Sequence, residues 1–497
     1  MDKYSSLHVE DINSTDDVLD SDSLALTNKL GHDFGFFGGL SLIFGIIATI
    51  LFYKVGIGLN SFIFTTIMVT ILIIVSKKLM IEIKKDTAFC FLLAILLGLS
   101  NVLTSSENLQ FLNSIGILLL LEISLIRLFS TRKSLSFTED LYKIIKLPFK
   151  ALSKVGMLFV DGNRYVKDKK LIKNEKFRNI LIGCAIAIPL LVVTIALLSS
   201  ADLLFGKIAK AMFEWILYRD FYLIIMLIIL GTLLCYSLLY GASKDSNASV
   251  REKAKASSTI GITVSTLLLL LYILFCSIQI LYLFAGGLFS LPDELTYAEY
   301  ARRGFFELLA VTCFNIILIL ICVTVFEENR LLKTLLTGIT ACTYIMIASA
   351  TYRMLLYISA YHLTFLRLLV LLFLLIDALL LLGVIISLYR KDFPLFGYSV
   401  VVISICYLIF SFSKPDYHIA KYLIAHTDEI ASEDIVYLTK DLSYDAAPVV
   451  IPFLKGHYEY NHYTYIDSYY NGAYSRRNKM DIRDYNVSYQ KAYNLMR

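Results

Sequence analysis

The sequence predicts an all-α polytopic membrane protein with about eleven transmembrane helices and a small, mostly helical C-terminal domain outside the membrane. Hydrophobic residues make up 57% of the 497 positions, and the mean hydropathy is +0.69, which excludes an ordinary soluble fold. Apolar segments recur between Phe34 and Phe412, and most reach the roughly 20 residues with which a helix crosses a bilayer. Helices are favoured because a backbone in lipid must satisfy its own hydrogen bonds.

The predicted spans form a group of four over 34–129 and a group of seven over 179–412, separated by a long polar insert. The spans are Phe34–Tyr53, Leu59–Ser76, Thr87–Leu103, Phe111–Phe129, Asn179–Ser199, Phe221–Gly241, Ile260–Phe284, Gly304–Val325, Thr334–Ile358, Phe365–Tyr389 and Phe396–Phe412.

The residues before the first span, 1–33, are polar and hold eight acidic side chains against Lys3 and Lys29. Such a composition predicts a disordered acidic tail. Because no basic segment precedes the first apolar run, that run is interpreted as a retained span and not as a cleaved signal peptide.

Lysine and arginine gather in alternate loops, from Lys77 and Lys78 through the dense stretch 132–178 to Arg390 and Lys391. The basic side of a membrane protein is normally cytoplasmic. With eleven spans, this rule places the N-terminus in the cytoplasm and the C-terminus outside it. An error of one span would reverse the second assignment.

The insert 130–178 is predicted to be a basic, amphipathic cytoplasmic loop. Ser136 and Glu139 have the spacing of a capping box that starts a helix. Lysines then follow at spacings of three and four, with apolar residues on the other side, although Pro148 is expected to kink the helix. This pattern favours anionic lipid headgroups as the partner. A basic loop that only sets topology is an equally open interpretation.

Two carboxylates fall near the middle of predicted spans, Glu122 in the fourth and Asp377 in the tenth. A charge at that depth is costly, so both side chains should face the interior of the bundle. One interpretation is an ion or proton site. The other is a carboxyl group that hydrogen-bonds between helices.

A cluster of aromatic and charged residues is predicted where the eighth span leaves the membrane. Thr296 and Glu299 form another capping box, and Arg303 can pair with Glu307 one turn later. Interfacial anchoring is the preferred interpretation, and a site for an anion or headgroup is the alternative. The cluster comprises Tyr297, Tyr300, Arg302, Arg303 and Glu307, with Arg353 and Arg367 from later spans.

The tail, 413–497, has fourteen tyrosines and is predicted to form a separate, mostly helical extramembrane domain. Helical periodicity is visible over 433–442 and 482–495, whereas 457–465 partly alternates and is expected to be extended. Tyrosines can supply a protein-binding surface, but packing within a small domain explains them as well.

The segment from Tyr297 to Leu308, Tyr-Ala-Glu-Tyr-Ala-Arg-Arg-Gly-Phe-Phe-Glu-Leu, resembles bacterial membrane proteins of the domain-of-unknown-function family 4173. Arg353–Arg367, Pro415-Asp416 and Leu442–Pro448 agree with that resemblance, while Lys414 and Leu423 depart from it where asparagines are expected. The resemblance covers roughly 180–454. It implies a multi-pass protein of a bacterial plasma membrane and no activity.

The sequence predicts no cofactor and no metal site, since it holds no phosphate-binding loop, nucleophile elbow or Cys/His metal spacing. Its eight cysteines all lie in predicted spans, which favours small packing residues over disulfides. The first functional hypothesis is a non-catalytic sensing or scaffolding component of the cell envelope. A secondary transporter or ion-coupled permease that uses Asp377 and Glu122 is the alternative, and an enzyme acting on lipid substrates is the third.

Overall fold

The computed structural model describes residues 26–130, 137–168, 219–244, 255–283, 305–390, 392–426, 432–456 and 463–497, together with part of 183–208. Ten of the described helices are long and apolar enough to cross a membrane, which confirms an all-α polytopic membrane protein. They are α2 (Phe34–Phe52), α3 (Leu59–Leu79), α4 (Lys85–Leu103), α5 (Glu107–Phe129), α10 (Arg219–Lys244), α11 (Ser258–Leu283), α13 (Phe305–Val325), α14 (Arg330–Tyr361), α15 (Phe365–Tyr389) and α16 (Leu395–Phe412).

Each of these ten helices contains most of one predicted span. Some are longer than the apolar run, and α14 extends beyond the predicted Thr334–Ile358 at both ends. The fifth predicted span, 179–199, lies largely outside the described residues. Residues 26–32 are helical, and Leu30 is buried in the core beside α2. The rest of the predicted acidic tail, residues 1–25, also lies outside the described part of the chain.

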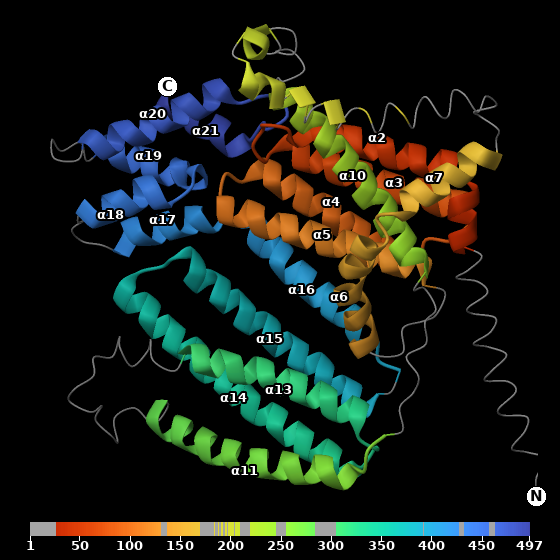
Figure 1. Cartoon of the computed structure of the whole chain (residues 1–497). Helices are drawn as coiled ribbons and strands as arrows, with labels where there is room; N and C mark the ends of the chain where they lie inside the picture. The colour runs from red at the N-terminus through yellow and green to blue at the C-terminus, as the bar shows by residue number, and fades with distance from the viewer. Residues whose placement is uncertain are drawn as a thin grey trace, which may run out of the picture.

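A first bundle consists of α2, α3, α4, α5 and α10 (Figure 1). Its core is formed by fully buried side chains such as Phe37, Val75 and Ala94. Helices α2 and α10 cross closely at Gly45 and Gly231, where a Cβ added to Gly231 would lie 2.9 Å from Gly45 Cα. Small residues permit this kind of backbone approach between membrane helices.

A second bundle consists of α11, α13, α14 and α15, built around Ile319, Leu336 and Leu381. Helix α16 lies between the two bundles (Figure 1), where it packs on α15 of the second bundle and on α4 of the first. The site described below lies in the second bundle.

The bundles share two ends, which we call the basic end and the tail end. The basic end holds the start of α2 and the amphipathic helices α6 (Phe137–Ser153) and α7 (Met157–Asp168). The tail end holds the start of α10, where Lys54 Nζ lies 2.6 Å from Asp220. Helix α7 therefore lies at the basic end, and α10 begins at the tail end.

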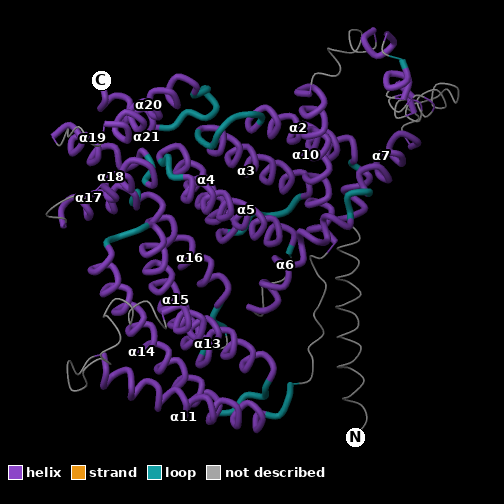
Figure 2. The backbone as a smooth tube through the Cα atoms, turned by 60° about the vertical axis from the view of Figure 1, so that its left-hand side comes forward, coloured by secondary structure: helices purple, strands orange, loops and turns teal. Residues whose placement is uncertain are grey.

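The tail contains α17 (Pro415–His426), α18 (Ser432–Val436), a π-helical turn (Tyr437–Asp441), a 3-10 turn (Tyr444–Ala446), α19 (Ala447–Gly456), α20 (Tyr463–Lys479) and α21 (Val487–Met496). These elements surround a core of their own and lie beside the ends of α4 and α5 (Figures 1 and 2). The prediction of an extended segment over 457–465 is wrong for its last three residues, which are helical and begin α20. Positions 457–462 lie outside the described residues.

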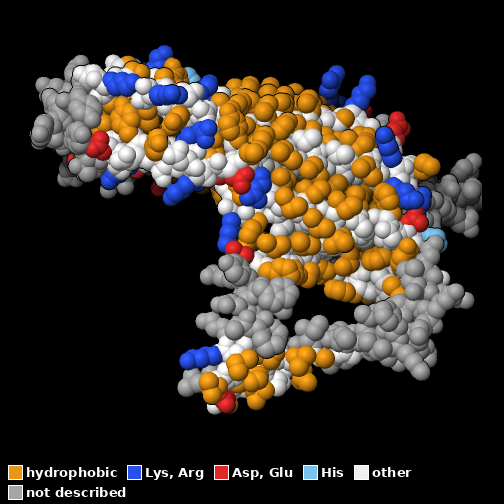
Figure 3. Space-filling view, turned by 90° about the horizontal axis from the view of Figure 1, so that it is seen from above, with side chains coloured by type: hydrophobic (Ala, Val, Ile, Leu, Met, Phe, Trp, Pro, Cys, Tyr) orange, Lys and Arg blue, Asp and Glu red, His pale blue; other side chains and the backbone are white. Residues whose placement is uncertain are grey.

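Hydrophobic side chains cover the middle of the face shown in Figure 3, and charged side chains gather toward its two ends. Large apolar residues on these helices are widely exposed, for example Ile50 on α2 and Leu118 on α5. An apolar surface of this size is costly in water and is typical of a lipid-facing belt.

Candidate functional site

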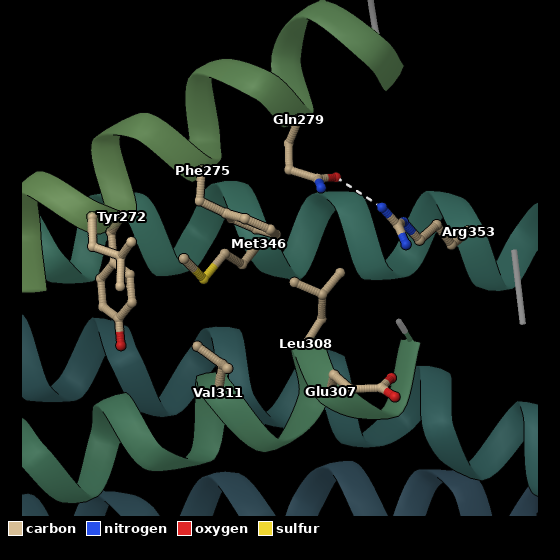
Figure 4. A pocket seen from close by; sticks show the side chains of 9 residues that line it. Tyr272, Phe275, Gln279, Glu307, Leu308, Val311, Met346 and Arg353 are labelled. Carbon is tan, nitrogen blue, oxygen red and sulfur yellow. Dashed lines mark hydrogen bonds between the residues drawn. The ribbon is translucent and has the colours of Figure 1, made fainter. Parts of the chain in front are cut away.

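An apolar pocket of about 320 Å³ lies among α11, α13 and α14 in the second bundle (Figure 4). Ligand pockets in proteins usually measure about 300–1,000 Å³, so this one suits a small or slender molecule. Each helix contributes residues from one face. The lining residues are Leu271, Tyr272, Phe275 and Gln279 of α11, Glu307, Leu308 and Val311 of α13, and Met346 and Arg353 of α14.

The helical repeat explains why these residues meet. On α11 the sequence places Leu271, Phe275 and Gln279 four residues apart, which puts them on one side of the helix. The spacing of seven between Met346 and Arg353 does the same on α14. The walls are therefore apolar over most of their length. The Tyr272 hydroxyl lies at one end, whereas the two charged groups and Gln279 gather at the other (Figure 4).

Arg353 provides the positive charge at that end. Its side chain is buried, with 6% exposure, and its Nη2 donates a hydrogen bond to Gln279 Oε1 over 3.1 Å. Ser349 Oγ donates to the same oxygen over 2.8 Å. The amide of Gln279 thus orients the guanidinium from a neighbouring helix, as Figure 4 shows.

Glu307 lies in the first turn of α13, at the same end of the pocket as Arg353 (Figure 4). A carboxylate is favoured there by the unsatisfied amide groups and the dipole of a helix N-terminus. Its side chain is exposed, whereas that of Arg353 is buried. The pocket therefore presents a buried cation and an exposed anion around one opening.

A hydrogen-bonded trio joins the three helices beside the apolar chamber. Tyr272 donates its hydroxyl to Asn315 Oδ1 over 2.7 Å, and Asn315 Nδ2 donates to Thr343 Oγ1 over 2.9 Å. Polar groups buried in a membrane bundle are stable only when they are paired. These bonds consequently fix the relative positions of α11, α13 and α14 around the pocket.

The structure brings together two residues of the predicted outer-interface cluster, Glu307 and Arg353. Arg367 does not join them. Its Nη1 donates to the carbonyls of Tyr361 and His362, and its guanidinium lies 4.2 Å from the ring centre of Tyr357, so it holds the turn between α14 and α15. The remaining members, Tyr297, Tyr300, Arg302 and Arg303, lie outside the described residues.

Asp377 is buried in the second bundle with 3% exposure. Thr312 of α13 lies within hydrogen-bonding distance of its carboxyl group, while its Oδ2 has no hydrogen-bond partner among the described residues. Thr312 follows Val311 of the pocket wall directly. Asp377 faces the bundle interior as predicted, although its proposed ion or proton role stays a prediction.

Glu122 is half-buried on α5, and its Oε1 has no partner in the described part of the chain. Arg127, one and a half turns along the helix, instead lies 3.6 Å from Asp86 of α4 and stacks on the ring of Phe396. The two predicted intramembrane carboxylates lie in different bundles, so the structure does not bring them together.

A second polar centre, which the sequence did not reveal, fastens the tail to the first bundle. The Asp445 side chain is fully buried and accepts hydrogen bonds from Thr104 Oγ1, from the Ser105 amide over 2.9 Å and from Ser105 Oγ over 3.2 Å. Lys414 Nζ lies 3.9 Å from Asp445 and donates to Ser488 Oγ over 2.9 Å. We call these contacts the tail junction.

Burial affects both charged neighbours of Asp445 on the α17 segment. It lowers the pKa of the Lys414 ammonium, although the charge of Asp445 partly opposes that shift. It raises the pKa of Asp416, whose carboxylate accepts from the Ser443 amide over 3.2 Å. Leu423, the other departure from the family pattern, is buried in the apolar core of the tail, where a leucine packs well.

The remaining candidate residues are possible metal ligands and the cysteines. No group of three or more His, Cys, Asp or Glu side chains that could hold a metal ion occurs in the described ranges. Seven cysteines there are free thiols, five of them buried. Cys276 Sγ donates to the Cys342 carbonyl over 3.5 Å, which fits the predicted packing role.

Residues 91–452 match the model of a family described as "Domain of unknown function (DUF4153)". No curated protein matches the chain, and no solved structure matches it. The expectation of an unknown-function family is confirmed, but the match is to this family and not to family 4173. Because the match covers more than two thirds of the sequence, the chain belongs to the DUF4153 family.

Proposed function

We propose that this multi-pass membrane protein is a non-catalytic sensing component of a bacterial plasma membrane, and that its ligand is an amphiphile with an apolar body and an anionic head. One observation carries the proposal: an apolar pocket ends at a buried arginine that is oriented by Gln279. The walls favour an alkyl chain or a similar body. The guanidinium favours a carboxylate or phosphate head, for which its planar fork of donors is suited.

The arrangement supports binding better than turnover. The polar groups that line the pocket are Tyr272, Gln279, Glu307 and Arg353, and none of them is a nucleophile held by an adjacent base. The tail also contacts the second bundle, because Phe365 and Leu368 of α15 pack on the tail core. A ligand that alters the second bundle therefore has a route to partners of the tail, as the sensing hypothesis requires.

Photolabelling tests the proposed ligand class. The full-length protein in lipid nanodiscs is exposed to a photoreactive long-chain fatty acid, and labelled peptides are identified by mass spectrometry. We expect labels on α11, α13 and α14 that an excess of unlabelled fatty acid removes. Even labelling of every lipid-facing helix, without competition, would contradict a specific pocket.

Matched variants on α13 sharpen this test. Val311→Phe fills the pocket from its wall, whereas Val323→Phe places the same ring on a lipid-exposed part of the same helix. Labelling should be lost in the first and retained in the second, with thermal unfolding as the check that both fold. Equal labelling of the two variants would mean that the ligand lies elsewhere.

The role of Arg353 is tested with Arg353→Gln and two ligands that differ only in the head group, a fatty acid and the corresponding fatty alcohol. A hydrogen bond to a charged group contributes about 1.5–3 kcal/mol. We therefore expect the wild type to prefer the acid by roughly tenfold or more and the variant to lose that preference. An unchanged preference would remove Arg353 from the site.

A second candidate function, ion-coupled transport, is favoured by Asp377 alone. A buried carboxylate in a membrane helix costs about 2.5–3.5 kcal/mol, and its Oδ2 has no partner among the described residues. Thermal unfolding of purified protein across pH and sodium concentration, repeated with Asp377→Asn, tests this role. Asp392→Asn, an exposed position at the basic end, is the control. A dependence of the Tm on pH or sodium that is lost in Asp377→Asn and kept in Asp392→Asn would support transport. A dependence that persists in Asp377→Asn would contradict it.

A further inference from the structure

Helix α6 has three different sides, and each faces a different environment. Leu147 and Ala151 form the first side. They are buried and lie against Gly241 of α10, so that a Cβ added to Gly241 would be 3.5 Å from Ala151 Cα. At its start, Phe137 packs on the ring of Phe396 in α16, with 5.9 Å between the ring centres.

The second side is an apolar row that points away from the protein. Its exposed fractions are 42% for Leu141, 58% for Ile145, 72% for Phe149 and 62% for Leu152. The spacings of four, four and three keep these residues on one face of the helix. The helix continues through Pro148, so the row is unbroken. Side chains this large and this exposed indicate contact with an apolar medium.

The third side carries the cations Lys143 and Lys146, joined by Lys154 in the turn that follows. At about 100° per residue, Lys143 and Lys146 lie roughly 135° around the helix from the apolar row. The ammonium of Lys150 is buried, and Lys150 is therefore left out of this set. A helix with apolar and cationic sides of this kind lies in the plane of a bilayer surface.

The position of α6 agrees with that geometry. It packs against α10 of the first bundle, against α13 of the second and against α16 between them, all at the basic end. Helix α7 follows after a short turn and is fixed to α10 by a 2.8 Å hydrogen bond from Tyr236 to Asp161. It carries an exposed aromatic side chain of its own, Phe159. Packing contacts with α10, α13 and α16 thus fix the orientation of α6. The apolar row and the lysines therefore have fixed directions relative to the two bundles.

We propose that α6 is a binding site for anionic phospholipid, and that the bound lipid strengthens the association of the two helix bundles. The lysines take the headgroup phosphates, and the apolar row lies among the acyl chains. Zwitterionic lipid satisfies the apolar row equally well, so the lysines provide the selectivity. Near an anionic surface, each lysine contributes about 1 kcal/mol, which is about fivefold in affinity.

The test compares full-length protein in nanodiscs of phosphatidylcholine alone and of phosphatidylcholine with phosphatidylglycerol. The variant K143Q/K146Q/K154Q keeps much of the side-chain length and removes three charges. The control K77Q/K85Q/K255Q removes three exposed lysines from other elements at the same end. Phosphatidylglycerol should raise the Tm of the wild type and of the control, and the rise should shrink with salt. The α6 variant should show no rise.

Three results would overturn the proposal. The α6 variant could retain the full rise in Tm, which would place any lipid effect elsewhere. Inorganic phosphate could raise the Tm in phosphatidylcholine as strongly as phosphatidylglycerol does, which would identify a soluble anion as the ligand. Finally, hydrogen exchange of α6 in the wild type could be equal in both lipids. That measurement needs no variant and holds even if the triple substitution fails to fold.

Discussion

Asp445→Asn should weaken the docking of the tail on the first bundle. The substitution keeps the size of the side chain and removes its charge, at a position where that side chain is fully buried. Three donors point at the carboxylate, namely the Thr104 hydroxyl and the amide and hydroxyl of Ser105. An amide can accept some of these bonds through its oxygen, but its NH₂ group must face at least one donor.

The expected cost follows from these contacts. Each hydrogen bond to a charged group contributes about 1.5–3 kcal/mol, and the contributions are not additive. Lys414 also loses its neighbouring anion, and breaking a buried pair costs about 3–5 kcal/mol. Because Lys414 is 28% exposed and water can solvate it, the lower end applies. We expect the docking of the tail to weaken by about 3 kcal/mol.

Hydrogen exchange of the full-length protein is the assay, because it reports local opening. A loss of about 3 kcal/mol corresponds to roughly hundredfold faster exchange in α17, α19 and α21, with α14 unchanged. Asp441→Asn, an exposed position in the same tail, is the control. Tail exchange that stays within about twofold of the wild type would refute the reasoning, and so would an equal increase in the control.

Three further predictions concern stability. Gly45→Ala should lower the Tm, because the added Cβ would collide with the Ile228 carbonyl and overpacking costs about 1–3 kcal/mol. Gly39→Ala should leave the Tm unchanged, because a Cβ there meets open space. Asn113→Leu should cost about 1–3 kcal/mol in chemical denaturation, because it leaves the Tyr407 hydroxyl, 2.7 Å from Asn113 Oδ1, without its acceptor; an unchanged midpoint would contradict this. Burial raises the pKa of Asp416 in the folded state above its ordinary value of 3.8. The stability that this shift contributes is fully present below pH 3.8, and it is lost as the pH rises through the folded-state pKa. Asp416→Asn should therefore flatten that part of the pH profile, and an identical profile would refute the assignment.

The sequence predicted the membrane helices well because hydropathy over about 20 residues is a local property. The ends of α15 were predicted without error, and those of α13 to within one residue. The tail was predicted to be helical and separate. Its junction was missed because the contact between Thr104 and Asp445 joins positions 341 residues apart, and nothing local to either position signals the other.

The candidate site was predicted in part. Glu307 and Arg353 stood out because a charge near a membrane span is unusual. Gln279 and Asn315 were overlooked, although a polar residue inside an apolar run is a signal of the same kind. Arg367 was grouped with the cluster because it lies near the same end of the molecule. Its bonds to the end of α14 depend on the left-handed backbone of His362, at φ 64°, which the sequence does not indicate.

The central claim is that the pocket among α11, α13 and α14 holds an amphiphile with its anionic head at Arg353. The most direct test is electron cryomicroscopy of the full-length protein in nanodiscs supplied with a long-chain fatty acid. We predict elongated density along Phe275, Val311 and Met346 that ends within hydrogen-bonding distance of Arg353, and its absence in Val311→Phe. A collapsed or water-filled pocket in the wild type, with fatty acid present, would contradict the account.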